Sequence, residues 1–147
     1  MTVYELITKH EGRRKKPYKC TGGKNTIGIG WNFDDNPLPP YIAGYLVKHG
    51  EITDEMIDYL LDISVQRAIG DCQYLFPDFA NFSINRQMAL TDFVFQLGLK
   101  RASGFVNSIA MINTGRWEEA AKNMMKSRWA TQTRKRAEEV TDLIAAG

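Results

Sequence analysis

The chain has 147 residues, enough for one domain with a real hydrophobic core. Its composition, 44% hydrophobic and 24% charged, is near the average of soluble globular proteins and excludes a disordered chain. The formal net charge of +2 is compatible with an anionic polymer as partner without requiring nucleic acid, and the longest apolar runs are too short to predict stable membrane insertion.

The N-terminal segment has the pattern of a helix. Thr2 and Glu5 match a capping box, and apolar residues follow at helical spacing, which predicts a helix over 3–11. Glu11 ends this helix, so its carboxylate is expected at the rim of whatever the helix packs against. The same segment lacks the basic start, apolar middle and cleavage site of a secretory signal. We therefore expect folding in the cytoplasm and export by another agent.

Residues 17–33 change to the alternating pattern of strands. Cys20 lies in the first strand, the turn sequence TGGKN follows, and 26–31 is predicted as a second strand. Gly28 and Gly30 weaken a strand and are typical of a close approach to another part of the chain. This segment therefore predicts a hairpin or small sheet. Its GxG fragment lacks the third glycine and the helix of a dinucleotide site.

A long helix is predicted after a loop and a short helix that ends before Gly50. Thr53 is its predicted N-cap, and acidic residues in its first turn complement the helix dipole. The apolar stripe continues for about four turns, until Phe76 and Pro77 interrupt it. A helix of that length suits a connection between two lobes.

The rest of the chain is predicted to be a helical lobe. Ser83 is the predicted N-cap of a helix that is apolar nearly all round, so this helix should be the buried centre of the lobe, and Gly98 is predicted to end it. Shorter helices are predicted near 105–113, 116–125 and 134–145.

The predicted fold class is α+β, with a small N-terminal lobe, a long connecting helix and an all-helical C-terminal lobe. We expect one domain over 1–147, and the cleft between its lobes is the natural binding site. The predicted parts are the small lobe at 12–52, the connecting helix at 53–75 and the helical lobe at 76–147, on which helix 3–11 packs.

The two cysteines, Cys20 and Cys72, form no recognisable metal or redox motif. There is no CxxC and no Cys/His pair at ligand spacing, so a zinc site with His10 and His49 is not favoured. Two free thiols are favoured over a disulfide in a protein folded in a reducing compartment, although the sequence leaves a disulfide open. We expect no metal and no cofactor.

Three residues match a family signature. Glu11, Cys20 and Thr26 fit the E-x8-D/C-x5-T pattern of the T4-type phage lysozymes, glycoside hydrolase family 24. The segment HEGRRKKPYKCTGGKNTIGIG looks like that family's helix end, basic strand, turn and second strand. The resemblance recurs, in order, in FVFQLG, GFVNSIAMI, GRWEEAAKNMMKSRW and QTRKRAEEV. Together these blocks are specific, and the chain resembles the family over nearly its whole length.

The resemblance implies a lysozyme-like fold and a muramidase. Such an enzyme hydrolyses the β-1,4 bond between N-acetylmuramic acid and N-acetylglucosamine in peptidoglycan, and phages use it for host cell lysis. By position, Glu11 is the catalytic acid, Cys20 stands at the second catalytic position and Thr26 helps hold the water. The implied substrate-binding residues and supporting arginines are Asn32, Phe95, Ser108 and Asn123, with Arg128 and Arg136.

Two positions depart from the family pattern. Asn32 stands where relatives usually have an apolar contact. Trp31 stands where many relatives have a histidine ion-paired to an aspartate, and Ser64 lies near the partner position. The absence of that ion pair is expected to affect stability and not the chemistry.

The chemistry expected of Cys20 differs from that of a carboxylate. A thiol is a poor base at its reference pKa of about 8.5, but nearby cations lower that value, and basic residues crowd 13–19. We favour Cys20 as base or electrostatic stabiliser in an inverting hydrolysis, with Thr26 orienting the water. Alternatively, Cys20 is a small buried hydrophobe, and activity depends on Glu11 and Thr26. Cys72 is interpreted as structural.

Other functions remain as alternatives. The chain is either a phage endolysin or a non-catalytic, glycan-binding or structural phage relative of lysozyme, and a lytic transglycosylase is a third interpretation. The basic cluster at 13–19 is either a solvated face or attracts anionic envelope surfaces. We expect a monomer that binds peptidoglycan glycan strands and no nucleic acid. It would be made in the host cytoplasm and reach the periplasm through a holin-type pore.

Overall fold

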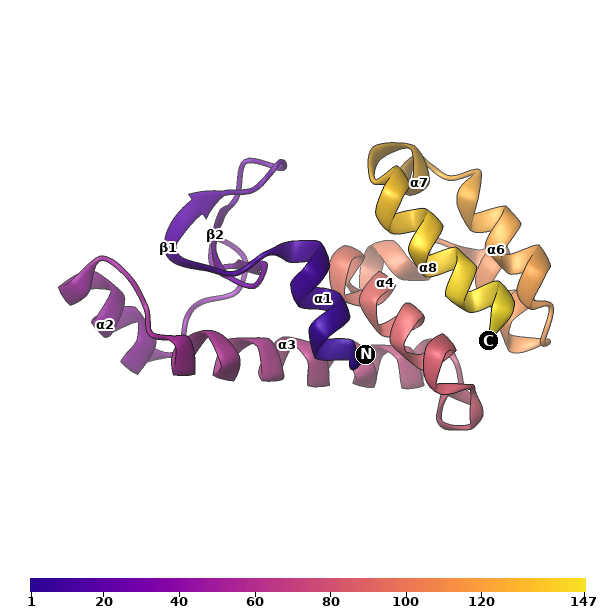
Figure 1. Cartoon of the computed structure of the whole chain (residues 1–147), viewed down its shortest axis with the longest axis horizontal. Helices are drawn as coiled ribbons and strands as arrows, with labels where there is room; N and C mark the ends of the chain where they lie inside the picture. Colours follow the sequence, from indigo (N-terminus) through magenta and orange to yellow (C-terminus); the bar gives the residue numbers. More distant parts are fainter. The chain divides into compact units, whose positions relative to one another are not determined.

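The computed structural model describes residues 1–147 as a largely helical chain with one small sheet (Figure 1). Its internal contacts define two compact units. The N-terminal unit is Tyr4–Val65, and the C-terminal unit is Gln66–Gly147 together with Met1–Val3. The boundary falls within the long helix α3 (Asp54–Leu75). The predicted α+β fold class is confirmed, while the predicted single domain with its lobe boundaries stays a prediction.

The N-terminal unit contains one antiparallel sheet of three strands in the order β1-β2-β3. Tyr18 pairs with Thr26 between the first two strands, and Ile27 pairs with Trp31 between the last two. The other elements of this unit are helices, and the full set is α1 (Val3–Glu11), β1 (Arg14–Lys19), β2 (Asn25–Gly28), β3 (Trp31–Asn32), α2 (Pro40–His49) and the first half of α3.

The predicted single strand over 26–31 is wrong. The chain turns at Ile29 and Gly30, so its last part becomes the short strand β3 and pairs back onto β2. Gly28 and Gly30 have φ values of 66° and 71°, which side chains other than glycine rarely adopt. The two glycines therefore reverse the chain where the alternating pattern suggested that it continues.

Local capping signals set the helix ends of this unit, as predicted. Gly50 ends α2 in the left-handed conformation, and its N–H donates to the Leu46 carbonyl. Thr53 Oγ1 accepts a hydrogen bond from the Met56 N–H at 3.1 Å and begins α3. The core of the unit is aliphatic and includes Leu6, Ile7, Ile27, Ile42, Ile52, Ile57 and Leu60.

The C-terminal unit is helical, and α4 (Ile84–Ser103) supplies its centre. Ser83 caps α4 as predicted, because its Oγ accepts the Arg86 N–H at 3.2 Å. Every residue from Met88 to Val94 is buried. The other elements are η1 (Phe79–Asn81), α5 (Val106–Asn113), α6 (Trp117–Met125), α7 (Arg128–Gln132) and α8 (Arg134–Ala146).

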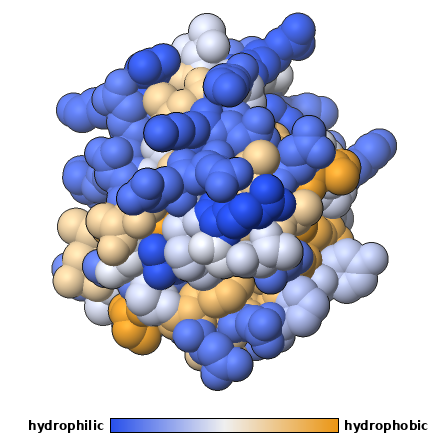
Figure 2. Space-filling view, turned by 90° about the vertical axis from the view of Figure 1, so that its right-hand side faces the viewer, coloured by the Kyte–Doolittle hydropathy of each residue, from blue (hydrophilic) through white to orange (hydrophobic).

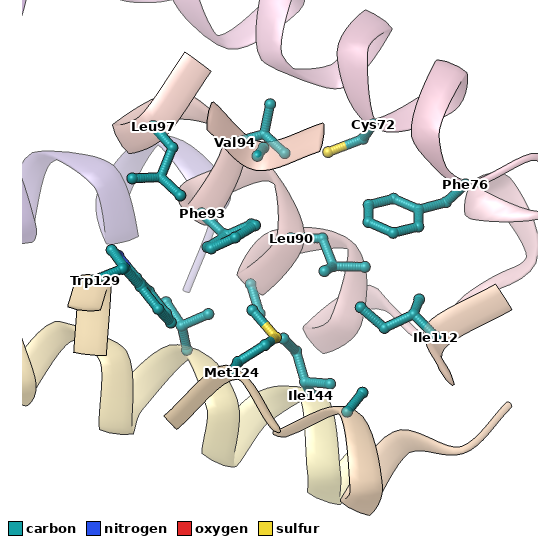
Figure 3. Packing of buried hydrophobic residues seen from close by; sticks show 14 of the residues in the cluster. Cys72, Phe76, Leu90, Phe93, Val94, Leu97, Ile112, Met124, Trp129 and Ile144 are labelled. Atoms are coloured by element: carbon teal, nitrogen blue, oxygen red, sulfur yellow. The ribbon is translucent and has the colours of Figure 1, made fainter. Parts of the chain in front are cut away.

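Aromatic rings order the centre of this core. Phe93 meets Trp129 and Phe105 edge to face, each with ring centroids 4.9 Å apart. In Figure 3, Phe93 of α4 points toward Trp129, and Leu90 lies on the side of Phe76 and Ile112. The helical lobe is thus held by interlocking rings and aliphatic groups from helices far apart in sequence.

Two predictions for the C-terminal unit are wrong in detail. Gly98 does not end its helix: with φ 79° and ψ 161° it kinks α4, which resumes and continues to Ser103. Helix α7 was not predicted at all. Its signal is Ser127, whose Oγ accepts the Ala130 N–H at 3.3 Å, but five residues are too few to show a periodic apolar pattern.

On the face shown in Figure 2, hydrophilic residues dominate the upper part, and apolar residues gather in the lower part among hydrophilic ones. None of the helices combines the length and hydropathy needed to span a bilayer. No group of three or more His, Cys, Asp or Glu side chains is arranged to hold a metal ion.

Candidate active site

The sheet of the N-terminal unit brings Cys20 and Thr26 to one face. Side chains of directly paired residues share a face, and so do residues two apart along an extended chain. Tyr18 pairs with Thr26, and the Cys20 N–H extends the pairing by donating to the Lys24 carbonyl at 3.0 Å. Cys20 is half-buried and Thr26 is 2% exposed. The predicted pair of Cys20 and Thr26 is therefore assembled locally, by the β1–β2 hairpin.

The hairpin turn favours the thiolate form of Cys20. The backbone N–H of Lys24 has the largest effect in lowering the pKa of the Cys20 thiol, and the Gly22 N–H and the Thr26 hydroxyl add to it. Burial opposes the shift. A thiol with a lowered pKa has more of the basic, nucleophilic form at neutral pH.

The lowered thiol pKa agrees with the sequence prediction in direction, but its cause differs. The prediction relied on neighbouring cations, whereas hydrogen-bond donors of the turn produce the shift. Two of the cations are engaged elsewhere: Arg13 contacts Asp58 at 2.7 Å and Asp54 at 3.1 Å, and Lys15 contacts Asp54 at 3.4 Å. Sequence proximity to Cys20 was therefore a poor guide to which groups act on it.

The Thr26 hydroxyl can form hydrogen bonds both with the turn and with a water molecule. Its Oγ1 lies 3.0 Å from the Lys24 carbonyl, and its one proton can be donated to that carbonyl or to the Cys20 thiolate. A hydroxyl has one proton and two lone pairs, so it retains acceptor capacity for a water molecule. This arrangement is compatible with the water-holding role that the sequence predicts.

Glu11 lies at the end of α1, half-buried, and its carboxylate contacts Gly30. A Cβ atom at Gly30 would be 3.0 Å from Glu11 Oε1 and 3.1 Å from its Cδ, closer than side chains normally approach. The close approach expected at the glycines of 26–31 is thus explained at Gly30 by the carboxylate itself. At Gly28 a Cβ would meet Ile57 at an ordinary 3.6 Å.

Tyr18 belongs to the same cluster, and sequence reasoning missed it. Burial has the largest effect in raising the pKa of its phenol, and the charges of Glu11 and Cys20 raise it further, while the Arg14 charge and the Gly30 N–H lower it. The guanidinium of Arg14 lies 4.7 Å from the centre of its ring. Its position two residues before Cys20 was the signal that could have found it.

Asn32 is used by the turn that follows β3. Its Oδ1 accepts the N–H groups of Asp34 at 3.0 Å and Asp35 at 3.2 Å, and its Nδ2 donates to Asp35 Oδ2 at 2.8 Å. This is an Asx-type turn, in which the side chain takes the place of a backbone group. The substrate-binding role of Asn32 stays a prediction, and this local bonding would hold its side chain in one orientation.

The C-terminal unit holds the other predicted substrate residues. Asn123 of α6 donates from Nδ2 to Ser108 Oγ of α5 at 2.8 Å, and Ser108 is 2% exposed. Phe95 of α4 is half-buried and packs against the hydrophobic core. Arg128, the first residue of α7, is exposed. The structure therefore brings Ser108 and Asn123 into direct contact, and the roles of all four residues stay predictions.

Arg136 makes a buried ion pair within the C-terminal unit. Its Nε and one terminal nitrogen contact the two carboxylate oxygens of Asp92 at 3.1 Å and 3.0 Å. The Asp92 side chain is fully buried and that of Arg136 is 11% exposed. This two-point geometry orients the guanidinium rigidly. The predicted supporting role of Arg136 near the catalytic acid is compatible with such a fixed cation.

Trp31 and Ser64 satisfy their polar groups through the backbone. Trp31 is 6% exposed and donates from Nε1 to the Asn36 carbonyl at 2.9 Å. The Ser64 hydroxyl donates to the Leu60 carbonyl at 3.0 Å. A buried aromatic ring thus occupies the position at which the sequence departs from the family pattern of an ion-paired histidine.

The two cysteines are free thiols with opposite surroundings. Cys72 is completely buried in the C-terminal core, and burial raises the pKa of its thiol from the ordinary 9.0 to about 12. A thiol in that state is neutral and inert at physiological pH. Its placement in the apolar cluster (Figure 3) is what the structural interpretation of Cys72 predicted.

Comparison with known proteins identifies the family. The phage lysozyme family model matches residues 8–143. "Probable T4-type lysozyme 2" of Dictyostelium discoideum is 31% identical over 161 residues, covering 99% of this chain and 95% of that protein. "Probable T4-type lysozyme 1" of the same organism is 30% identical, with coverage of 99% and 95%.

A third relative is much longer. The "Pre-baseplate central spike protein Gp5" of Enterobacteria phage T4 is 32% identical over 161 residues, which cover 100% of this chain but 28% of the spike protein. The match to the family model extends over nearly the whole chain, and the candidate acid, thiol and threonine lie inside it. The chain therefore belongs to the phage lysozyme family of peptidoglycan hydrolases and is a glycoside hydrolase of the lysozyme type.

Proposed function

We propose that the protein is a phage endolysin, an inverting muramidase that cleaves the β-1,4 bond between N-acetylmuramic acid and N-acetylglucosamine. The observation that carries the proposal is the cluster in the N-terminal unit, where the Glu11 carboxylate contacts Gly30 and the adjacent hairpin joins Cys20 to Thr26. Glycoside hydrolysis with inversion needs one protonated acid and one group that activates water. The cluster offers a candidate for each task.

In the proposed mechanism, Glu11 transfers its proton to the glycosidic oxygen as the bond to the anomeric carbon breaks. Thr26 holds a water that attacks this carbon from the opposite face. The Cys20 thiolate, favoured by the N–H groups of the turn, accepts a proton from that water or stabilises the positive charge that grows on the sugar. Direct attack by sulfur is less favourable, because the thioglycoside formed would be slow to hydrolyse.

The proposal is tested by the clearing of permeabilised Gram-negative cells, with Glu11→Gln as the control variant. The wild-type protein should lower turbidity, and Glu11→Gln should not, because the amide has no acidic proton to transfer. Equal clearing by both proteins would exclude Glu11 as the acid. Mass spectrometry of the released muropeptides separates hydrolysis, which leaves reducing ends, from transglycosylation, which leaves anhydro ends.

The stereochemical outcome is a separate measurement. Proton NMR of the first products from a soluble glycan fragment should show the α-anomer, because water attacks opposite the β-linked leaving group. An initial β-anomer would indicate retention and would remove the assigned role of the Cys20 thiolate.

A second candidate function comes from the relative in the phage T4 baseplate spike. That relative is 32% identical over the whole of this chain, which makes a non-catalytic glycan-binding or structural phage component the alternative. Sedimentation with purified peptidoglycan distinguishes the two. Binding without any release of soluble muropeptides would favour the alternative.

We also propose that the protein is made in the host cytoplasm and reaches peptidoglycan through a holin-type pore. Expression in a Gram-negative host should cause lysis only when a holin is expressed with it. Lysis by the protein alone, with no membrane-permeabilising partner, would contradict this route.

A further inference from the structure

We infer that Asp34 is a positioning residue of the proposed active site: it holds the peptide group whose carbonyl joins Cys20 to Thr26. The kinetic part of this inference rests on the proposed function. Asp34 belongs neither to the family signature nor to the residues that the resemblance implies.

The peptide group between Lys24 and Asn25 connects the two residues of the hairpin that carry the proposed chemistry. Its carbonyl oxygen accepts the Cys20 N–H at 3.0 Å, and Thr26 Oγ1 lies 3.0 Å from the same oxygen. One oxygen atom therefore contacts both residues. A rotation of this peptide plane would move that oxygen, and with it the bond that holds Cys20 and the contact of the Thr26 hydroxyl.

Asp34 binds the nitrogen side of the same peptide group. Because a peptide group is planar and trans, its N–H and its carbonyl point in opposite directions and turn together. The Asn25 N–H donates to Asp34 Oδ2 at 2.8 Å, and Asn25 Nδ2 donates to Asp34 Oδ1 at 2.9 Å. These bonds engage both carboxylate oxygens, so the carboxylate fixes the direction in which the peptide plane faces.

Asp34 is itself held by the loop after β3. Its N–H donates to Asn32 Oδ1 at 3.0 Å, and the Phe33 N–H donates to the Asn25 carbonyl at 3.0 Å. The loop therefore contacts Asn25 at its N–H, its carbonyl and its side chain. The pKa of the Asp34 carboxyl is lowered, foremost by the Asn25 N–H, so the carboxylate is ionised throughout the neutral range.

The charge of Asp34 adds to the effect of its geometry. Hydrogen bonds that act on one polar group polarise one another, so a carboxylate on the N–H makes the carbonyl of that group a stronger acceptor. The Lys24 carbonyl then holds the Cys20 N–H more firmly than it would with a neutral side chain on the nitrogen side. An amide at position 34 keeps an acceptor oxygen without the charge.

The first test compares Asp34→Ala with Asp142→Ala. Both changes remove an exposed carboxylate, and Asp142 lies on α8 in the C-terminal unit. On soluble glycan fragments Asp34→Ala should lower kcat roughly fivefold or more, because a small misplacement of a catalytic group is costly. KM should stay within about twofold, since Asp34 has no assigned contact with the sugar. Asp142→Ala should match the wild type.

Asp34→Asn is the conservative variant. Its amide oxygen can accept the Asn25 N–H, but its NH₂ group cannot accept a bond from the Asn25 side chain. Its kcat should therefore lie between the values of the wild type and Asp34→Ala.

The second test reads the state of the peptide group without activity, by amide hydrogen exchange followed by NMR. The Cys20 amide hydrogen should exchange with solvent roughly fivefold faster or more in Asp34→Ala than in the wild type, because its acceptor is no longer held in place. Asp142→Ala should leave this rate unchanged. Asp34→Asn should show a smaller increase, and it decides the question if Asp34→Ala folds poorly.

Two outcomes would overturn the inference: wild-type kcat in a folded Asp34→Ala, or a wild-type exchange rate of the Cys20 amide in both variants of Asp34. Failure of the proposed function is recognised separately. In that case the wild-type protein releases no muropeptides, while the exchange rates still report whether Asp34 holds the peptide group that contacts Cys20.

Discussion

Local backbone geometry lowers the pKa of the Cys20 thiol, at a position where family members have an acid or a cysteine. The donors that favour its thiolate are N–H groups of its own turn, at Lys24 and Gly22, and the hydroxyl of Thr26. They come with the hairpin and do not depend on flexible lysine side chains. The pKa of the Cys72 thiol is shifted in the opposite direction, because this residue is buried among apolar groups and burial disfavours the ionised form.

The first prediction at this scale concerns substitutions of Cys20. Cys20→Asp should keep or raise the lytic rate, because a carboxylate is already ionised at neutral pH. Cys20→Ala should lower the rate roughly a hundredfold or more, because general-base assistance is lost. Clearing rates of permeabilised cells measure both. Full activity of Cys20→Ala would make the assignment of a base to this position wrong.

The dependence of the lytic rate on pH, measured for the wild type and for Cys20→Asp, tests the same role of residue 20. A base must be deprotonated, so the wild-type rate should rise with pH through the thiol pKa, which lies below the ordinary 9.0. In Cys20→Asp the same rising limb should move to the acidic side, since an unperturbed aspartate ionises near pH 4. If the rate of both proteins rose over the same pH range, residue 20 would not be the group whose ionisation sets this limb.

A second residue-scale prediction uses Cys72 as a probe of alkaline stability. Its folded-state pKa of about 12 lies above the ordinary 9.0, so folding favours the neutral thiol. The stabilisation is complete below pH 9 and is lost as the pH rises toward 12. Between pH 8 and 11 the thermal midpoint of the wild-type protein should therefore fall more steeply than that of Cys72→Ala. If the thermal midpoints of the two proteins fell in parallel as the pH rises, whatever the difference between them, ionisation of Cys72 would not contribute to the alkaline loss of stability.

At the scale of elements, two glycines within helices differ in backbone conformation. Gly98, with φ 79°, kinks α4. The helix was predicted to end at this residue, but it bends there and continues to Ser103. Gly70 lies in regular helix within α3, where it contributes no special conformation. At neither position would a Cβ meet another atom within 4 Å, so backbone conformation alone distinguishes them.

The element-scale prediction is a matched pair of substitutions. Gly98→Ala should lower the unfolding free energy by about 1–2 kcal/mol, because a side chain is strained at positive φ. Gly70→Ala should raise it by up to about 1 kcal/mol, because alanine loses less conformational entropy in a helix. Urea denaturation measures both. Stabilisation by Gly98→Ala would show that the kink is not required by the fold.

At the scale of the whole molecule, contacts between distant segments hold each unit together. In the C-terminal unit the Asp92–Arg136 pair joins α4 to α8 across 44 residues of sequence. The aromatic contacts of Phe93 with Phe105 and Trp129 join α4 to the segments that begin α5 and α7 in the same way. The unit therefore depends on α4, the helix whose centre is entirely buried.

The whole-molecule prediction is that Asp92→Ala lowers the unfolding free energy by about 3–5 kcal/mol, because it leaves the Arg136 charge without its buried carboxylate. The control is Glu138→Ala, which removes the partner of Arg134 at 2.9 Å on the exposed face of α8. An exposed ion pair contributes little, so this variant should unfold with the wild type. Equal unfolding midpoints for the two variants in urea would show that the buried pair is not stabilising.

The sequence by itself determined the α+β class, most helix boundaries and the order of the family signature. These features depend on signals within a few residues, such as the caps at Thr53 and Ser83 and the apolar stripe of α4. The hairpin that joins Cys20 to Thr26 was predictable for the same reason, since its turn and strands lie within one short segment. It also explains the errors at 26–31 and Gly98, where the backbone angle of a glycine, invisible in the pattern, decided the path of the chain.

The tertiary structure alone decided which groups act on one another. It placed the Glu11 carboxylate against Gly30, added Tyr18 to the cluster and traced the lowered pKa of Cys20 to the turn and not to the basic residues nearby. It also paired Arg136 with Asp92 and enclosed Cys72 in the core. The physical reason is that burial, hydrogen bonding and charge act over a few ångströms in space, and chain folding brings together residues that no sequence window contains.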